Sequence, residues 1–293
     1  MNFNVLCPTS KEDLLKMISE NQGGNFRFGA GYTDLIMELK KQTPEGLTVI
    51  NLAQLKDDEF TGISECKDGL RIGALASANS VIADITIKEG YPVLHSASSK
   101  LASCQIRQVA TVGGNMCTAS PAGDIANALV ALKAKCEILN SSGVLRTIDI
   151  DDFFKGVRQT DLRKNEVLRS ILLPFNVTKA VSSGFIKIGT RRSMECSVIS
   201  LAYHIQVENN NRISNAGISI GSAAPTIKFT SSACEYLIGR NYTSIGEPEA
   251  EQFASHVLEY ATPISDIRAT AWYRKEVLFN ISKSIFDNNK RGR

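Results

Sequence analysis

Two short glycine-containing segments are the parts of this sequence best suited to bind a ligand. The first, Gly29-Ala30-Gly31-Tyr32-Thr33, stands between a strand-like run at residues 25–28 and an apolar helical pattern that starts at Leu35. Glycine permits positive φ and lets backbone N–H groups approach a ligand without interference from a Cβ atom. Successive N–H groups ahead of a helix bind anions, and Thr33 adds a hydroxyl donor. The segment predicts either an anion-binding turn or a plain strand-to-helix turn capped by Thr33 or Asp34.

The second segment, Thr111-Val112-Gly113-Gly114-Asn115, repeats this arrangement later in the chain. Neither segment has the third glycine of a dinucleotide-binding fingerprint or the lysine of a P-loop. Two such loops in one chain predict a pyrophosphate that is held from both sides. Asp124 would then bind a ligand hydroxyl, as carboxylates bind ribose. Its alternative role is the N-cap of the apolar helical run at residues 125–132.

Composition and charge describe an ordinary globular protein. The chain has 293 residues, a formal net charge of +3, 43% hydrophobic and 22% charged residues. This balance argues against a nucleic-acid-binding surface. No apolar run reaches the roughly 18 residues that a membrane-spanning helix needs, and no signal peptide is evident, so we expect a cytoplasmic protein without membrane insertion.

Cysteine and histidine residues are too scattered to suggest a metal site. Single, odd-numbered cysteines without C-x-x-C pairs argue against disulfides, zinc and iron–sulfur clusters, and most of them are expected to be small buried hydrophobes. His95, His204 and His256 share no ligand spacing and are expected to be surface or packed residues. The seven cysteines are Cys7, Cys66, Cys104, Cys117, Cys136, Cys196 and Cys234.

Hydrophobic patterning predicts an α+β protein that divides near residue 178, with a linker at residues 176–183. A first helix is expected after an N-cap at Thr9 or Ser10, and residues 140–143, Asn-Ser-Ser-Gly, predict a hairpin turn. The other expected helices are residues 80–89, 93–103, 125–132, 231–238 and 270–286. The expected strands are residues 25–28, 47–52, 70–74, 136–139, 145–148, 166–174, 184–189, 197–208 and 213–222.

The two segments together carry a family resemblance. G-A-G-Y-T-D-L at residues 29–35, with Q-I-R-Q-V-A-T-V-G-G-N and T-A-S-P-A-G-D within residues 105–124, resembles the FAD-binding subunit of the molybdenum hydroxylases. That family includes xanthine dehydrogenase, nicotinate dehydrogenase and aerobic carbon monoxide dehydrogenase. The resemblance continues through residues 166–168, 185–192 and 266–274, and so covers nearly the whole chain.

This resemblance implies a fold and a set of FAD ligands. The fold is a vanillyl-alcohol-oxidase-type (PCMH) FAD-binding domain at residues 1–177, in two subdomains split near residue 56. A smaller α+β flavoprotein domain with a three-stranded sheet follows at residues 178–293. The implied ligands are the first loop around the pyrophosphate (Arg27, Phe28, Gly29, Ala30, Gly31, Tyr32, Thr33 and Asp34), Thr111, Gly114 and Asn115 on its other side, Thr118 and Asp124 at the sugars, Leu168 by the adenine and Lys187 near the flavin ring.

Two residues depart from the family pattern. Tyr32 replaces a common second glycine of the first loop, and we expect negative φ there, with the ring over part of the cofactor. Glu195 stands where the family usually has Asp, which is expected to alter a structural contact. The segment at residues 158–165 is expected to be a surface loop or a partner-docking element. Asp266, Arg268, Tyr273 and Arg274 are expected to form structural ion pairs or part of a subunit interface.

The implied function is electron transfer within a larger oxidoreductase. This chain would receive electrons from [2Fe–2S] clusters on an iron–sulfur small subunit, after substrate oxidation at a molybdopterin-binding large subunit, and pass them from FAD to an acceptor such as NAD⁺. The chain holds no metal or catalytic residues of its own in this interpretation. The alternatives are a free-standing flavin oxidoreductase with its own substrate pocket and a non-catalytic nucleotide-binding module.

Overall fold

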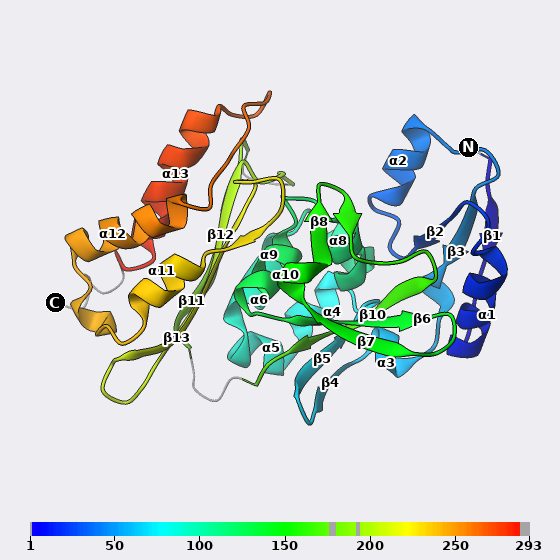
Figure 1. Ribbon diagram of the computed structural model, residues 1–293, viewed down its shortest axis with the longest axis horizontal. Coiled ribbons are helices and arrows are strands. Elements are labelled where there is room, and N and C mark those ends of the chain that lie inside the picture. The colour runs from blue at the N-terminus through cyan, green and yellow to red at the C-terminus, as the bar shows by residue number, and fades with distance from the viewer. Residues whose placement is uncertain (1, 176–179, 192–193, 288–293) are drawn as a thin grey trace.

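The computed structural model describes residues 2–175, 180–191 and 194–287. Three sheets follow one another along the long axis of the molecule, in the order of the chain (Figure 1). The N-terminus lies at one end of this axis and the C-terminus at the other. No helix among these residues is long and apolar enough to cross a membrane.

A small parallel sheet forms the N-terminal end of the molecule. Its strands lie in the order β1 (Asn4–Leu6), β3 (Thr48–Asn51), β2 (Phe26–Gly29). Ser10 is the N-cap of helix α1 (Lys11–Asn21), because its hydroxyl accepts a hydrogen bond from Asp13 N. The expected N-cap is therefore confirmed. The sequence had not predicted β1.

The central sheet is antiparallel, and the helices of the central part of the chain pack against it. The expected hairpin turn is confirmed, because Asn140 Oδ1 accepts from the backbone N–H groups of Ser142 and Val144 at 2.9 Å, and Gly143 adopts φ +79°. The strands in spatial order are β4 (Ile63–Cys66), β5 (Gly69–Gly73), β10 (Glu166–Leu173), β6 (Lys135–Asn140) and β7 (Leu145–Asp149).

Short capped helices cover this sheet, and one expected helix is in fact two. The expected helix at residues 80–89 is interrupted at Asp84, whose carboxylate accepts from Ile87 N at 3.0 Å and starts a new helix. Side-chain caps favour such restarts because they satisfy the free N–H groups of a helix start. The helices here are α3 (Asp58–Thr61), α4 (Ala78–Ala83), α5 (Ile85–Gly90), α6 (Pro92–Lys100), α7 (Cys104–Val109), α8 (Val112–Thr118), α9 (Asp124–Ala131) and α10 (Ile150–Phe153). The short hairpin β8 (Phe154–Gly156) and β9 (Gln159–Thr160) follows α10.

The third sheet has four strands, so the expectation of three was wrong. A two-residue strand, too short to leave a clear alternating pattern, pairs with the edge of β13. One face of the sheet packs against α6 and α9, and the other is covered by the C-terminal helices (Figure 1). The elements are β11 (Ala180–Ile188), β12 (Ile199–Val207), β13 (Ile213–Gly221), β14 (Lys228–Phe229), α11 (Ser231–Leu237), α12 (Glu247–Leu258) and α13 (Ala271–Ser284).

Part of the expected linker belongs to this sheet. Residues 176–179 lie outside the described residues, and residues 180–183 already form the start of β11. The basic C-terminal residues 290–293 also lie outside the described part. The sequence had not predicted α12 or β4.

A buried ion-pair network fixes β10, the strand that leads to the candidate site. Glu137 is 5% exposed and accepts hydrogen bonds from Arg71 Nε at 2.8 Å, from Arg169 at 3.1 Å and from the Ser170 hydroxyl. Burial alone would raise the pKa of Glu137, but these donors outweigh it and lower the pKa to about 2 from its usual 4.5. The carboxylate is therefore ionised throughout the physiological range.

The Glu137 network should make stability depend on pH in acid. Because the folded pKa lies below the unfolded one, the stabilisation is complete above pH 4.5 and is lost as the pH falls towards 2. Glu137→Gln should lower the free energy of unfolding by about 3 kcal/mol at pH 7 and by progressively less between pH 4.5 and 2. Urea unfolding at several pH values measures this, with the exposed Glu65→Gln on the same sheet as the control. Equal losses for both variants at pH 7 would contradict the assignment.

Candidate functional site

One long cleft gathers almost every residue that the sequence singled out. It has a volume of about 760 Å³ and lies between the loop after β2, helix α8 and the end of β11. Of the predicted ligands, all except Gly29 line it: Arg27, Phe28, Ala30, Gly31, Tyr32, Thr33, Asp34, Thr111, Gly114, Asn115, Thr118, Asp124, Leu168 and Lys187. Segments more than 150 residues apart in the sequence therefore line the same cleft.

The loop between β2 and α2 (Leu35–Lys41) offers unpaired backbone donors to this cleft. The N–H groups of residues 30–34 donate to no acceptor among the described residues. Tyr32 adopts φ 59°, so the expectation of negative φ was wrong. A left-handed residue within a turn points successive N–H groups towards one side, which is the geometry that binds anions. The loop therefore suits a phosphate group.

The glycines of this loop serve packing as well as ligand access. A Cβ atom on Gly29 would lie 2.4 Å from the Tyr32 ring, which explains why Gly29 is absent from the cleft lining. The Tyr32 ring packs with Leu35, Leu39 and their neighbours, and burial raises the pKa of its hydroxyl. A Cβ atom on Gly31 would lie 1.9 Å from Val109 O on the opposite wall.

The Thr111–Asn115 segment differs from the expected anion-binding loop. It caps and begins helix α8, and the N–H groups of residues 112–115 are already used within the chain. Val112 N donates to Ala76 O at 3.0 Å, Gly113 N to Ala74 O at 2.7 Å, and Gly114 N to Thr111 Oγ1 at 3.0 Å. The helix still lines the cleft, but as a close-packed wall with small side chains rather than as a second row of free donors.

Asp124 lies in a buried ion pair between the central part of the chain and the third sheet. Lys187 Nζ, from β11, is 2.6 Å from Asp124 Oδ2, and the Ser197 hydroxyl donates to Oδ1 at 3.1 Å. Burial raises the pKa of Asp124, and the Lys187 ammonium opposes this shift. The side chains of Asp124 and Lys187 are 3% and 6% exposed, so the pair lies at the deep end of the cleft.

The alternative role of Asp124 as an N-cap is wrong. Helix α9 begins at Asp124 itself. Its N-cap position is Gly123, which has no side chain, so the helix start has no side-chain cap of its own. Asn115 Oδ1 from α8 accepts from Ala126 N at 3.0 Å and performs this task from outside the helix. A cap contributed by a residue eleven positions earlier leaves no local pattern in the sequence.

Leu168 and Thr118 lie where β10 and the end of α8 meet the cleft. Leu168 is 3% exposed and precedes a β-bulge in the pairing of β10 with β6. Bulges re-aim side chains and are common beside functional sites. Thr118 precedes Ala119, which adopts φ 46° at the end of α8.

Left-handed backbone at non-glycine residues is concentrated at this cleft. Such residues cost free energy and persist where the surroundings require them, often at functional sites. Tyr32, Ala102, Arg158 and Met194 all have positive φ and all line the cleft. Three of them had not been predicted as site residues, because backbone angles at non-glycine positions cannot be deduced from composition.

Several other lining residues were not among the predicted ligands. Glu195 lines the cleft and accepts from Arg191 N at 3.2 Å, in agreement with the expected structural contact. Cys117 and Cys196 also line it, and only Cys136 and Cys234 of the seven free cysteines are buried, so the expectation of mostly buried cysteines was wrong. The other missed residues are Leu35, Glu38, Leu52, Ala74, Leu75, Leu101, Ala102, Ile106, Ala110, Gly113, Ser120, Ala122, Gly123, Arg158, Leu162, Val167 and Met194.

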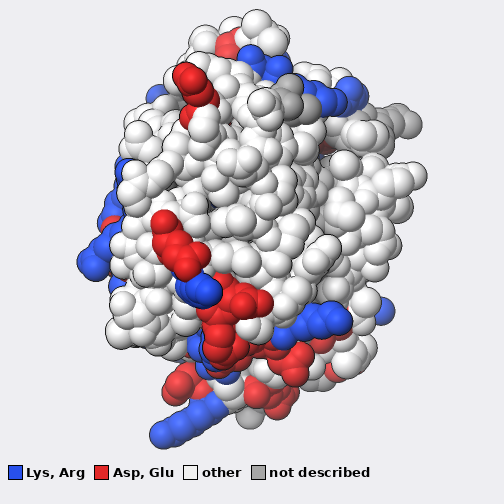
Figure 2. All heavy atoms as spheres, turned by 90° about the vertical axis from the view of Figure 1, so that its right-hand side faces the viewer, with Lys and Arg blue, Asp and Glu red and all other residues white. Residues whose placement is uncertain are grey.

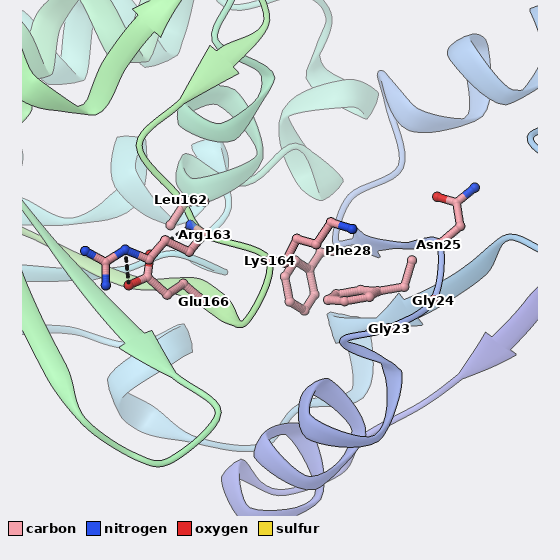
Figure 3. Close-up of a pocket in the computed structure, with 9 residues that line it drawn as sticks. Gly23, Gly24, Asn25, Phe28, Leu162, Arg163, Lys164 and Glu166 are labelled. Atoms are coloured by element: carbon pink, nitrogen blue, oxygen red, sulfur yellow. Dashed lines mark hydrogen bonds and ion pairs between the residues drawn. The ribbon is translucent and has the colours of Figure 1, made fainter.

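A second, smaller cavity of about 550 Å³ adjoins the cleft and shares Phe28 and Leu162 with it. Arg163 and Glu166 lie together on one side of it and Asn25 on the other (Figure 3). None of the predicted ligands except Phe28 lines this cavity. The larger cleft is therefore the candidate functional site.

The remaining candidates from the sequence have structural roles. Arg274 is 2% exposed, pairs with Asp266 at 2.8 Å and donates to Val198 O, which indicates a structural ion pair. His204 is buried, which lowers its pKa to about 4, and no three potential metal ligands lie together among the described residues. At the N-terminal end of the molecule, charges of both signs mix and a wide area is uncharged (Figure 2).

Gly114→Val should impair cofactor retention more than it impairs folding. A Cβ atom on Gly114 meets only Thr111 Oγ1, at 2.8 Å, so the added methyl groups extend towards the cleft at the cost of the Thr111 cap. We expect a loss of FAD affinity of about tenfold or more, since overpacking costs about 1–3 kcal/mol. Flavin absorbance per protein after gel filtration measures retention. Gly90→Val, where a Cβ atom meets nothing within 4 Å, is the control, and unchanged flavin content in Gly114→Val would contradict the assignment.

The fold and the cleft define an α+β protein with a cleft that suits an extended, phosphate-containing ligand. Residues 1–176 match the model of the FAD binding domain in molybdopterin dehydrogenase, and residues 185–288 match the CO dehydrogenase flavoprotein C-terminal domain. The chain belongs to the family of FAD-binding medium subunits of the molybdenum hydroxylases.

Three curated relatives match over nearly their whole length. The xanthine dehydrogenase FAD-binding subunit of Escherichia coli O157:H7 is 28% identical, over 93% of this chain and 91% of the relative. The glyceraldehyde dehydrogenase medium chain of Sulfolobus acidocaldarius is 27% identical, over 97% of both chains. The nicotinate dehydrogenase FAD-subunit of Eubacterium barkeri is 26% identical, over 97% of this chain and 95% of the relative.

Solved structures share the fold at lower identity. A chain of the reconstituted CO dehydrogenase from Oligotropha carboxidovorans superposes with a TM-score of 0.88 at 21% identity, over 97% of this chain and 96% of that chain. A chain of quinoline 2-oxidoreductase from Pseudomonas putida 86 gives a TM-score of 0.87 at 22% identity, over 100% and 98%. This protein is the FAD subunit of a multi-subunit molybdenum hydroxylase.

Proposed function

We propose that this chain binds FAD in the cleft and relays electrons between partner subunits and a soluble acceptor. The observation that carries the proposal is the row of unpaired N–H groups at residues 30–34, which lie in the lining of a cleft of about 760 Å³. FAD supplies the redox chemistry, since it accepts electrons one or two at a time. The chain supplies binding, orientation and the surrounding charge.

The residues of the cleft suggest an orientation for the cofactor. The first loop, with Thr33, would hold the pyrophosphate opposite the small residues of α8. Leu168 offers an apolar surface for the adenine, and Lys187 would lie near the flavin ring at the buried end. Asp124 would hold the Lys187 side chain in place at that end. Both Asp124 carboxylate oxygens already accept a hydrogen bond, one from Lys187 and one from Ser197, so a contact with the sugar portions would use an oxygen that already has a partner.

Arg27, Phe28, Ala30, Gly31, Tyr32, Asp34, Thr111, Gly114, Asn115 and Thr118 complete the proposed set, with Gly29 acting through Tyr32. The proposed architecture is a vanillyl-alcohol-oxidase-type (PCMH) FAD-binding domain at residues 1–177, divided near residue 56, and a C-terminal flavoprotein domain at residues 178–293. The buried residues of the C-terminal helices and of the sheet face that they cover form one cluster within residues 199–286, which supports a separate C-terminal unit.

The proposed partners follow from the family. Substrate oxidation would take place on a molybdopterin-binding large subunit, and electrons would arrive through [2Fe–2S] clusters on a small subunit. The acceptor would be NAD⁺, by analogy with the xanthine dehydrogenase relatives. Free cysteines suit a cytoplasmic location, and no partner nucleic acid is proposed.

Anaerobic flavin spectroscopy tests this function. The isolated chain loaded with FAD should keep its oxidised flavin spectrum when purines, aldehydes or nicotinate are added. The flavin should bleach only when the iron–sulfur and molybdopterin subunits that copurify with the chain are also present. Direct bleaching by one of these substrates would favour a free-standing flavin oxidoreductase. A chain that stays colourless after incubation with FAD would overturn the flavoprotein assignment.

A further inference from the structure

Three charged side chains link the two walls of the cleft at its outer edge. Glu38 Oε2 on α2 is 2.8 Å from an Arg27 guanidinium nitrogen on β2, and Glu38 Oε1 is 3.1 Å from an Arg158 guanidinium nitrogen. Arg158 lies 120 residues after Glu38, in the turn between β8 and β9 on the opposite wall. All three residues line the cleft. We call this Arg27–Glu38–Arg158 group the cleft bridge.

The backbone at Arg158 is held in the conformation that the bridge requires. Arg158 has φ 61°, a region that favours glycine or asparagine and costs an arginine free energy. Its N–H group donates to Ala119 O at 3.0 Å, so the turn is attached to the wall next to Thr118. A glycine would adopt this turn without strain, so the turn geometry alone does not account for an arginine here. The ion pair with Glu38 accounts for the arginine at this position.

The hairpin that carries Arg158 is braced independently of the cleft bridge. Arg146 binds Asp161 at 2.8 Å and Glu166 at 2.7 Å, and Lys155 binds Asp161 at 3.4 Å. Loss of Glu38 therefore leaves the hairpin in place and frees only the connection to α2. On the other wall, Arg27 and Glu38 stand on either side of the loop at residues 30–34, so their ion pair also fixes the ends of that loop.

We propose that the cleft bridge closes over the bound cofactor and sets the rate at which FAD leaves. This inference rests on the proposed function. The bridge lies at the exposed edge of the cleft, since its side chains are 37–51% exposed, in contrast to the buried Asp124–Lys187 pair at the other end. An extended ligand between the two walls can leave through this edge only after Glu38 separates from Arg158. Glu38 and Arg158 are thus positioning residues for cofactor retention.

The rate of FAD release measures the bridge directly. FAD-loaded protein is diluted rapidly to a concentration at which released FAD does not rebind, and the rise of free-FAD fluorescence is followed at low and at high salt. Exposed ion pairs contribute about 0–1 kcal/mol each, so Glu38→Gln and Arg158→Gln should each speed release about three- to fivefold at low salt. High salt should speed release from the unmodified protein and have little effect on either variant, because it screens exposed pairs.

The double variant Glu38→Gln/Arg158→Gln separates the bridge from a direct phosphate contact. If the two residues act through one ion pair, the double variant should release FAD no faster than the faster single variant. Additive effects, with Arg158→Gln much the larger, would overturn the bridge and place Arg158 on the phosphates. Arg163→Gln is the control, because Arg163 is a more exposed arginine after the same hairpin and its guanidinium lies 3.9 Å from Glu166, while the hydrogen bond from its backbone N–H to Glu166 is kept in the variant.

The outcomes distinguish this inference from the proposed function. Release rates equal to those of the unmodified protein in both single variants would overturn the bridge while the chain remains a flavoprotein. A chain that takes up no FAD in any variant would instead overturn the proposed function. Circular dichroism melting of the FAD-free variants shows whether a change in rate comes from a loss of folding.

Discussion

The start of helix α9 is the point on which the arrangement of this molecule depends. All eight residues of the helix are buried, so its polar first turn must find partners inside the protein. Asn115 provides one from α8, and Lys187 and Ser197 provide the others from the third sheet. Further along the helix, Asn127 binds Ser200 and Ser219 of the same sheet. These contacts hold the central and C-terminal parts together and thereby fix the deep end of the cleft.

The two glycine segments contribute to the cleft in different ways. The loop at residues 30–34 presents unpaired donors, whereas the segment at residues 111–115 uses its donors to pack against residues 74 and 76. Glycine at Gly113 is needed for that approach, since a Cβ atom would lie 2.7 Å from the side chain of Ala74. The same residue type therefore serves anion binding on one wall and close packing on the other.

Most of the longer strands and the helices α1, α6, α9 and α13 could be predicted from the sequence, because alternation and helical periodicity are local properties, although the twelve-residue helix α12 was missed. The hairpin at Asn140 and the cap at Ser10 were predictable for the same reason. Tyr32 could not be predicted, because its positive φ depends on space above Gly29 that only the folded chain provides. The break at Asp84 and the four-residue or shorter elements β1, β4 and β14 leave too little pattern to detect.

The candidate site was predictable as a list of residues but not as a set of contacts. Residues in glycine motifs or in family patterns were found, whereas Glu38 and Arg158 were missed, because their pairing joins positions 120 residues apart. Asp124 was found, but its partners Lys187 and Ser197 come from β11 and from the segment between β11 and β12, so its buried ion pair was not foreseen. Long-range polar contacts are set by the tertiary fold and leave no periodic signature.

Helix α2 and the small parallel sheet share a buried cluster, Leu35, Leu39, Leu47 and Val49, that is distinct from the core of the central helices, and residues from both parts line the cleft. A ligand in this position is packed on both sides by protein and becomes part of the interior. Its binding free energy then adds to the stability of the N-terminal end, in proportion to the logarithm of its concentration. The cellular supply of the cofactor would in this way regulate how much of the subunit persists in a form that can assemble.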